Sequence, residues 1–135
     1  MSVDARAIPH RRAWVAATAA FLIHSIEEKA LDLPAWTTAH PTFPWLNWMA
    51  PKGVFSIATG MLSLVVGAVA VYAIATGPGW SRRALQVLAI VMLANAASHI
   101  ALSLATDSAM PGVATAALVI FPVMLGALWA IRRPT

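Results

Sequence analysis

The sequence contains no cysteine and only five acidic residues among its 135 positions. The absence of cysteine excludes disulfides, thiolate nucleophiles and cysteine-ligated metal sites. Charged residues make up 10% of the chain and hydrophobic residues 60%, whereas a soluble domain is about 25% charged. A chain of this size cannot bury so much apolar surface within its own core. The composition therefore predicts an integral membrane protein.

Basic residues are distributed unevenly along the chain and account for its net charge of +4. They flank the apolar segments, which is typical of membrane orientation and not of a nucleic-acid-binding surface. By the positive-inside rule, we expect both termini to be cytoplasmic in a bacterial-type inner membrane. The predicted cytoplasmic side carries Arg6, Arg11, Arg12, Arg82, Arg83, Arg132 and Arg133, and the other side carries Lys29 and Lys52.

Four apolar segments are each about 20 residues or longer, which is the length needed to cross about 30 Å of hydrocarbon. They predict helices over approximately residues 12–31, 52–76, 82–105 and 111–131. At this size the four helices form one integral membrane domain over residues 1–135. The expected fold class is all-α, a four-helix transmembrane bundle with both termini inside.

The segment between the first two predicted helices, residues 32–52, is rich in proline and tryptophan. Its prolines exclude a continuous helix, although a short helix fits around residues 44–49. Tryptophan favours the headgroup region of a bilayer. We therefore expect an interfacial loop that roofs the bundle. The residues concerned are Pro34, Trp36, Pro41, Pro44, Trp45, Trp48 and Pro51.

Two predicted helices carry polar residues at matching depth. His24 and Glu28 are four residues apart and share a helix face, with Glu27 beside them, and Asn95 and His99 have the same spacing. At 1.5 Å per residue, each pair lies about 18 and 24 Å from the arginines of its own helix. Thr115 lies one turn inside the fourth helix. Because polar residues within a membrane are costly and normally face a bundle interior, the sequence predicts one shared polar pocket in the outer half of the bilayer.

Glycine and proline give two further expectations. Gly53, Gly60 and Gly67 recur every seven residues in the second predicted helix and stack near one face, where small residues permit close helix approach. This face is a candidate surface for a homo-oligomer. Pro122 falls in the middle of the fourth predicted helix and is expected to kink it.

Three short motifs resemble those of the HXXEE-motif integral membrane proteins, a family of unknown function. The motif His-x-x-Glu-Glu corresponds to residues 24–28, Asn-x-x-x-His to residues 95–99, and Pro-Gly-x-x-Thr to residues 111–115. All three occur in order. The resemblance implies an enzymatic site but supplies no substrate.

Three kinds of chemistry suit these residues. In the first, His24, His99 and one or both of Glu27 and Glu28 bind zinc or non-haem iron in a metal-dependent hydrolase or oxygenase, with Glu28 as the carboxylate of the candidate ligand set. In the second, which we favour slightly, no tightly bound metal is required. Glu27, Glu28, His24 and His99 then act as acid and base in an isomerase, cyclase or hydrolase, because a carboxyl group in a low-dielectric pocket can hold a proton. In the third, the same residues form a binding or transport module.

In each enzymatic hypothesis Asn95 and Thr115 orient the substrate. The expected partners are membrane lipid and a lipid-like or apolar small molecule. The sequence identifies neither the substrate nor the reaction, and it leaves the oligomeric state open.

Overall fold

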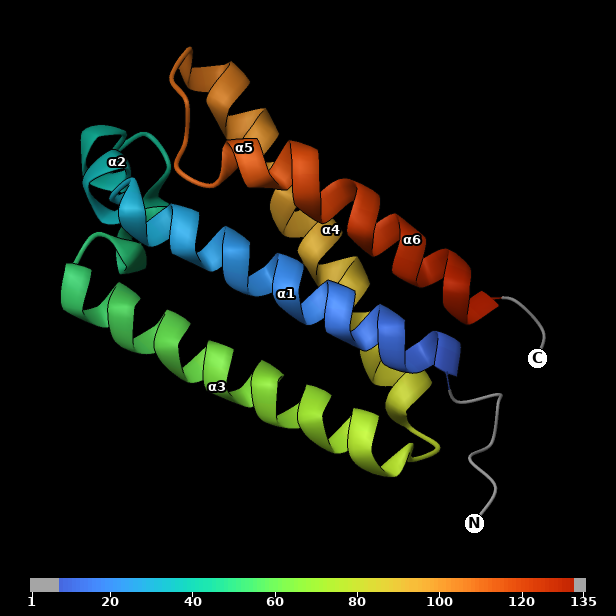
Figure 1. Ribbon diagram of the computed structural model, residues 1–135. Coiled ribbons are helices and arrows are strands. Elements are labelled where there is room, and N and C mark those ends of the chain that lie inside the picture. The colour runs from blue at the N-terminus through green and yellow to red at the C-terminus, as the bar shows by residue number, and fades with distance from the viewer. Residues whose placement is uncertain (1–7, 133–135) are drawn as a thin grey trace.

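A computed structural model describes residues 8–132, all of whose regular secondary structure is helical (Figure 1). The long helices are α1 (Ile8–Ala30), α3 (Lys52–Thr76) and α4 (Ser81–Thr106). The last helical segment consists of α5 (Val113–Thr115), the π-helix η3 (Ala116–Ile120) and α6 (Phe121–Arg132). The all-α prediction is confirmed. Arg6 and Arg133, which contribute to the predicted orientation, lie outside the described residues.

Three helical segments of the described chain are long and apolar enough to cross a membrane, not the four predicted from the sequence. They are Lys52–Thr76, Ser81–Thr106 and Val113–Arg132. Helix α1 has 23 residues, enough length for a span, but is not among them. Arginines near its start and Glu27, Glu28 and Lys29 near its end shorten its apolar part. Of its polar residues, His24, Ser25 and Glu28 are buried, whereas the arginines and Lys29 are exposed.

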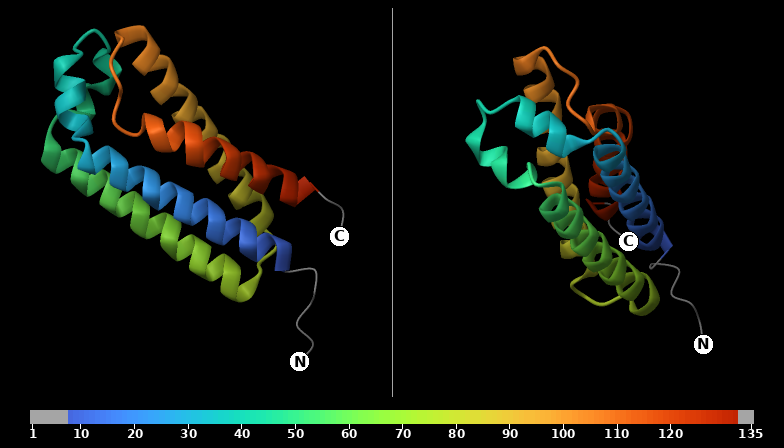
Figure 2. Two further views of the ribbon diagram at one scale, coloured as in Figure 1. Left: turned by 45° about the horizontal axis from the view of Figure 1, so that its top comes forward. Right: turned by 90° about the vertical axis from the view of Figure 1, so that its left-hand side faces the viewer.

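Helix α1 lies between α3 on one side and α4 with α6 on the other (Figures 1 and 2). One face of α1 is buried at intervals of three or four residues, and α4 and the last helical segment each have a similar buried face. Alanine recurs on all three faces and permits close helix packing. The buried positions are Ala13, Ala17, Ala20, His24 and Glu28 on α1; Leu85, Ala89, Met92, Ala96 and His99 on α4; and Ala116, Ile120, Met124, Ala127 and Ile131 on the last segment.

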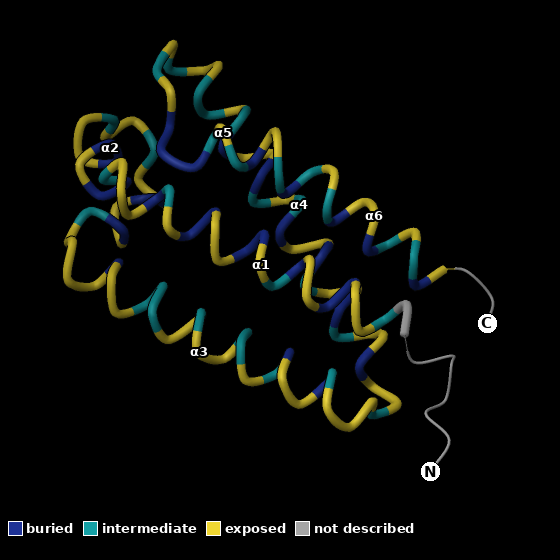
Figure 3. Tube along the Cα trace, viewed as in Figure 1, coloured by how far each residue is buried: buried dark blue, intermediate teal, exposed yellow. Residues whose placement is uncertain are grey.

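Helix α3 is peripheral and packs mainly on α1 (Figure 3). Only 11% of its most apolar window is buried, compared with 28% for each of the other two candidate spans. At Gly53, Gly60 and Gly67 a Cβ atom would meet nothing else in the described chain within 4 Å. The glycines therefore do not mediate close packing within this chain, where alanines serve that purpose.

The proline-rich segment forms two short helices rather than a loop with one. These are α2 (Leu33–Ala39), which the sequence analysis missed, and the 3₁₀-helix η2 (Pro44–Met49), which it anticipated. Pro34 lies in the first turn of α2, where its missing N–H costs nothing. Asp32 caps α2 through its side chain and pairs with Lys52 at the start of α3. The hydrogen bond from Lys52 lowers the pKa of the Asp32 carboxyl group below its ordinary value.

The sequence predicts a kink at Pro122. In the structure, a π-helical turn lies directly before this proline. Proline has no N–H and so cannot continue the α-helical hydrogen-bond ladder. The backbone N–H of Phe121 bonds instead to the carbonyl of Ala116, five residues earlier. Such single π turns are frequent at functional sites, and this one follows Thr115 immediately.

A buried hydrogen bond joins α1 to α4, and its loss should be measurable. Trp14 Nε1 donates to Ser81 Oγ over 2.8 Å, and both residues are buried. Replacing Trp14 by Phe leaves the hydroxyl group unpaired, so we expect a loss of about 1–2 kcal/mol in the free energy of unfolding. The double variant W14F/S81A should recover most of it. Unfolding in detergent measures the effect, with the exposed Trp48→Phe as control; equal stability of W14F and W48F would contradict this assignment.

Candidate functional site

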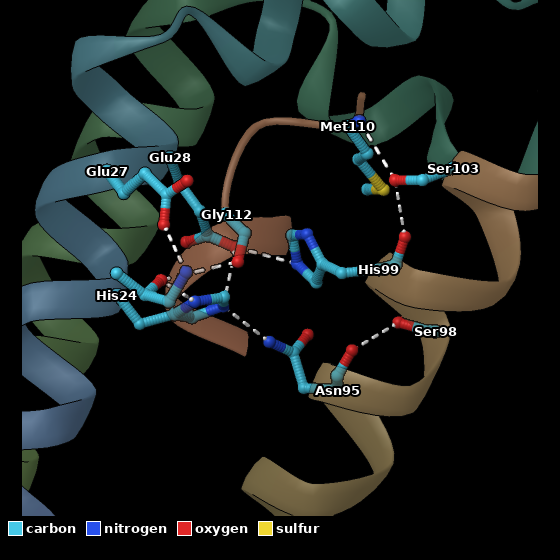
Figure 4. A network of polar contacts seen from close by, with 10 residues as sticks. His24, Glu27, Glu28, Asn95, Ser98, His99, Ser103, Met110 and Gly112 are labelled. Carbon is cyan, nitrogen blue, oxygen red and sulfur yellow. Dashed lines mark hydrogen bonds and ion pairs between the residues drawn. The ribbon is translucent and has the colours of Figure 1, made fainter. Parts of the chain in front are cut away.

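The polar residues singled out from the sequence come together at the end of the bundle nearest α2 (Figure 4). His24 and Glu28 extend the buried face of α1, and His99 extends that of α4. Thr115 approaches from the start of the last helical segment and Asn95 from α4. Residues separated by up to 91 positions therefore form one polar network within an apolar bundle.

Glu28 lies between the two imidazoles. Its Oε1 atom is 3.1 Å from His99 Nε2 and 3.4 Å from His24 Nε2. The rings are edge to face, with centroids 4.8 Å apart and an interplanar angle of 77°. His24 and His99 are 1% and 2% exposed and Glu28 is 8% exposed. A carboxylate so far removed from water needs charged or hydrogen-bonding partners, and the two imidazoles supply them.

Both nitrogens of the His24 ring have a partner. Nε2 is 2.9 Å from Asn95 Nδ2 and Nδ1 is 2.8 Å from Thr115 Oγ1. With the Asn95 amide donating to Nε2, the proton of neutral His24 is on Nδ1 and is donated to Thr115. Thr115 in turn donates to the carbonyl of Gly112 over 3.3 Å. Turning the amide presents its oxygen to Nε2, which suits a protonated His24 paired with Glu28. Asn95 can thus serve either proton state.

His99 has one nitrogen with no partner. Its Nε2 faces Glu28, whereas Nδ1 is buried and makes no hydrogen bond in the described chain. When Nε2–H donates to the carboxylate, Nδ1 carries a bare lone pair. A buried polar atom without a partner is rare and calls for an explanation.

Glu27 has a different role from its neighbour. Its Oε2 atom accepts a hydrogen bond of 2.8 Å from the backbone N–H of Thr115. Thr115 is the third residue of a helix whose N-cap is Gly112, which has no side chain to cap it. A carboxylate is favourable at a helix N-terminus. Glu27 of α1 therefore caps the last helical segment from outside it.

Gly112 permits the chain to pass close to both imidazoles. Its φ angle is +97°, a left-handed conformation that favours glycine. A Cβ atom there would lie 2.8 Å from His99 Cε1 and 2.9 Å from His24 Cε1. The third motif of the sequence thus brings the Gly112 backbone against both histidines, in addition to the Thr115 hydroxyl group at His24.

The turn over the histidines is tied to α4 and to the short helices. Ser103 Oγ donates to the carbonyl of His99 over 2.7 Å and accepts from the N–H of Met110 over 2.9 Å. Trp36 Nε1 of α2 donates to Ser108 Oγ over 3.1 Å. The Met110 side chain is buried in a cluster with residues of α2 and η2, including Trp36. The predicted roof therefore contacts the site through residues 108–112.

Three ligand atoms of the site could hold one metal ion. His24, Glu28 and His99 each offer one such atom, all within 4.8 Å of one another. Their Nε2–Oε1 separations of 3.1 and 3.4 Å resemble the roughly 3.3 Å between ligands at the corners of a tetrahedron around zinc. Two features oppose this use: Asn95 already engages His24 Nε2, and His99 Nδ1 lacks the outer partner that a ligating histidine normally has.

Sequence reasoning did not find the backbone contribution of Gly112, the capping by Glu27 or the link through Ser103. The adjacent Pro111 and Gly112 were a signal for a sharp turn, but not for its position over the imidazoles. Nothing in the spacing of Ser103 indicates that its hydroxyl bridges two backbone groups.

Substituting Gly112 tests the close approach. We expect Gly112→Ala to lower the free energy of unfolding by about 1–3 kcal/mol, because the left-handed backbone becomes strained and the new methyl group clashes with both rings. Gly126→Ala is the matched control, since a Cβ atom there meets nothing within 4 Å. Thermal unfolding in detergent compares the two, and similar midpoints would refute the proposed packing.

Comparison with known proteins agrees with the motifs. A family described as a protein of unknown function with HXXEE motif matches residues 14–127, which include every residue of the site. No curated protein and no solved structure matches the chain. Since the family match covers most of the sequence, the chain belongs to the HXXEE-motif family.

Proposed function

We propose that this protein is a membrane-embedded enzyme in which Glu28 and His99 act together as a general base on an apolar or lipid-like molecule. The observation that carries the proposal concerns the buried His99 ring. Its Nε2 atom faces the Glu28 carboxylate, and its Nδ1 atom has no hydrogen-bond partner in the described chain. A carboxylate so positioned fixes the tautomer and stabilises the imidazolium that forms when the ring takes a proton.

Within this pair, His99 exchanges the proton with the substrate and Glu28 stabilises the charge that forms on the ring. His99 Nδ1 removes a proton from the substrate while Glu28 accepts the hydrogen bond from Nε2–H and balances the new positive charge. Return of the proton to another atom of the substrate gives isomerisation or cyclisation, and removal of the proton from a water molecule gives hydrolysis. His24, held by Asn95 and Thr115, stands on the other side of Glu28 and, when protonated, donates to the carboxylate through Nε2.

The surroundings of the site support an apolar substrate. On α1 the outward-facing neighbours Ile23 and Ile26 are 48% and 65% exposed, and Leu118 beside Thr115 is 77% exposed. A molecule that approaches between the helices therefore passes apolar side chains. Because His99 Nδ1 is enclosed, the turn at residues 107–112 must move to admit it.

The membrane orientation also belongs to this proposal. The starts of α1 and α4 and the end of α6 lie at one end of the bundle (Figure 1). The arginines Arg11, Arg12, Arg82, Arg83 and Arg132 belong to these parts of the chain. The positive-inside rule makes that end, with both termini, cytoplasmic. The site then lies towards the outer leaflet of a bacterial-type inner membrane, with α1 crossing the bilayer against α3, α4 and α6 and with part of its surface exposed.

Solvent isotope uptake tests the proposed chemistry without knowledge of the substrate. Purified protein is incubated in D₂O or H₂¹⁸O with a lipid extract of its expression host, and mass spectrometry follows species that change or gain label. We expect Glu28→Gln and His99→Gln to reduce the labelling rate by about 10²–10⁴-fold, the usual contribution of a general base. Glu27→Gln should have a much smaller effect, because an amide oxygen can still cap the helix.

His10→Gln is the matched control for His99→Gln, since it makes the same substitution at the other end of the bundle. If folded E28Q and H99Q produced the same labelled species as the wild type, or if the wild type produced none, the proposal would fail.

A metal-dependent enzyme is the second candidate, favoured by the proximity of ligand atoms from His24, Glu28 and His99. These residues would be the ligands of zinc or iron, with the metal supplying Lewis-acid or redox chemistry. Thr115 would fix the His24 ring through Nδ1, as outer-sphere partners of ligating histidines do. In this case Glu27, which caps a helix, remains outside the ligand set.

Metal analysis separates the two candidates. If the second is correct, protein purified without chelator contains about one equivalent of zinc or iron, which His24→Ala and His99→Ala lose because too few ligands remain. His40→Ala, which changes a histidine of the short-helix region, should retain it. Full isotope exchange by metal-free wild-type protein, or retention of the metal by H99A, would exclude the metal-dependent candidate.

A further inference from the structure

A second candidate site lies at the opposite end of the bundle. A cavity of about 230 Å³ is lined by His10, Arg11 and Trp14 of α1, by the turn at residues 77–79, and by Ser81 and Arg82 of α4. None of these residues takes part in the polar network around Glu28. The cavity is thus lined by two arginines and a histidine that come from two different helices.

The charge around this cavity is uncompensated within the described chain. Within residues 8–132 the acidic residues are Glu27 and Glu28 near the end of α1, Asp32 just before α2 and Asp107 just after α4, whereas the cavity is at the starts of α1 and α4. The ion pairs of residues 8–132 join Glu28 to two histidines and Asp32 to Lys52, and no arginine takes part. Arg11 and Arg82 are exposed and can therefore pair with an anion from outside this part of the chain.

The shape and polarity of the cavity suit a phosphate group. Arginine presents a planar fork of donors that matches phosphate oxygens. Helix α4 is 26 residues long and begins at Ser81, so the positive end of its dipole is at the cavity. The buried bond from Trp14 to Ser81 fixes the spacing of the two helices that form the walls. Basic pockets between membrane helices commonly bind anionic lipid headgroups.

We propose that this cavity binds a phosphate group, with Arg11 and Arg82 as its two ligands from α1 and α4. The phosphate belongs either to the headgroup of an anionic lipid or to a free phosphate ion, and the two sources share the same recognition chemistry. Binding clamps the start of α1, which lacks the apolar length of a membrane span, to the start of α4.

Lipid retention by the full chain tests the proposal. Protein purified in detergent is mixed with phosphatidylglycerol or phosphatidylcholine, and bound lipid per chain and the thermal midpoint are measured. We expect preference for phosphatidylglycerol and a higher midpoint with it, since a ligand that binds the folded state stabilises it. The double variant R11Q/R82Q should lose about tenfold or more in affinity for phosphatidylglycerol, and R11K/R82K, which keeps the charge but not the fork, should lose less.

The matched control is R12Q/R83Q, which removes the same charge from neighbouring residues that do not line the cavity. It should retain nearly full affinity. Equal losses in the two double variants would overturn the proposal, and so would equal binding of the two lipids by the wild type if inorganic phosphate also left its thermal midpoint unchanged. Inorganic phosphate distinguishes the two sources. If phosphate raises the thermal midpoint and displaces lipid, and R11Q/R82Q abolishes both effects, the ligand is the free ion. If only lipid raises the midpoint, the ligand is the headgroup. No binding of either would also overturn it.

Discussion

The structure depends on the burial of one carboxylate, that of Glu28, between two imidazoles. An unpaired ion in an apolar bundle would cost several kcal/mol. Glu28 is 8% exposed and lies 3.1 and 3.4 Å from the Nε2 atoms of His99 and His24. These contacts require α1 and α4 to meet at a fixed height and rotation. The alanines along the buried face of α1 allow that close approach, so the packing and the polar site specify the same arrangement.

The adjacent glutamates divide two tasks. Glu28 points into the network, and Glu27, one helical step away, caps the last helical segment at Thr115. The cap holds the turn with Gly112 against the imidazoles, and the same threonine fixes the His24 ring. The motif of two consecutive carboxylates is therefore understandable without two catalytic roles. One group maintains the geometry in which the other can exchange a proton.

Much of the architecture could be predicted from the sequence because it follows from periodicity and depth. Equal distances from the arginines were enough to expect His24, Glu28, Asn95 and His99 at one height. The predicted number of membrane spans was wrong, because α1 is long enough for a span but is not apolar enough. Helix α2 was missed because the prolines of its segment favour a loop, although one of them suits a first turn.

Finer features were unpredictable for a different reason. The left-handed turn at Gly112, the capping by Glu27 and the π turn before Pro122 each depend on backbone groups of another element or on the local hydrogen-bond ladder. Residue spacing carries no information on these relations. The glycine repeat of α3 shows the converse, since a regular pattern there corresponds to no close contact within the described chain.

The position of Glu27 near the start of the chain has a consequence for biosynthesis. Its partner Thr115 is made 88 residues later, and Asn95 follows His24 by 71 residues. As the ribosome delivers α1, Glu27 lacks its partner Thr115, and Glu28 has only His24 of its own helix and not yet His99. The complete polar network can therefore form only after the last helical segment has been synthesised.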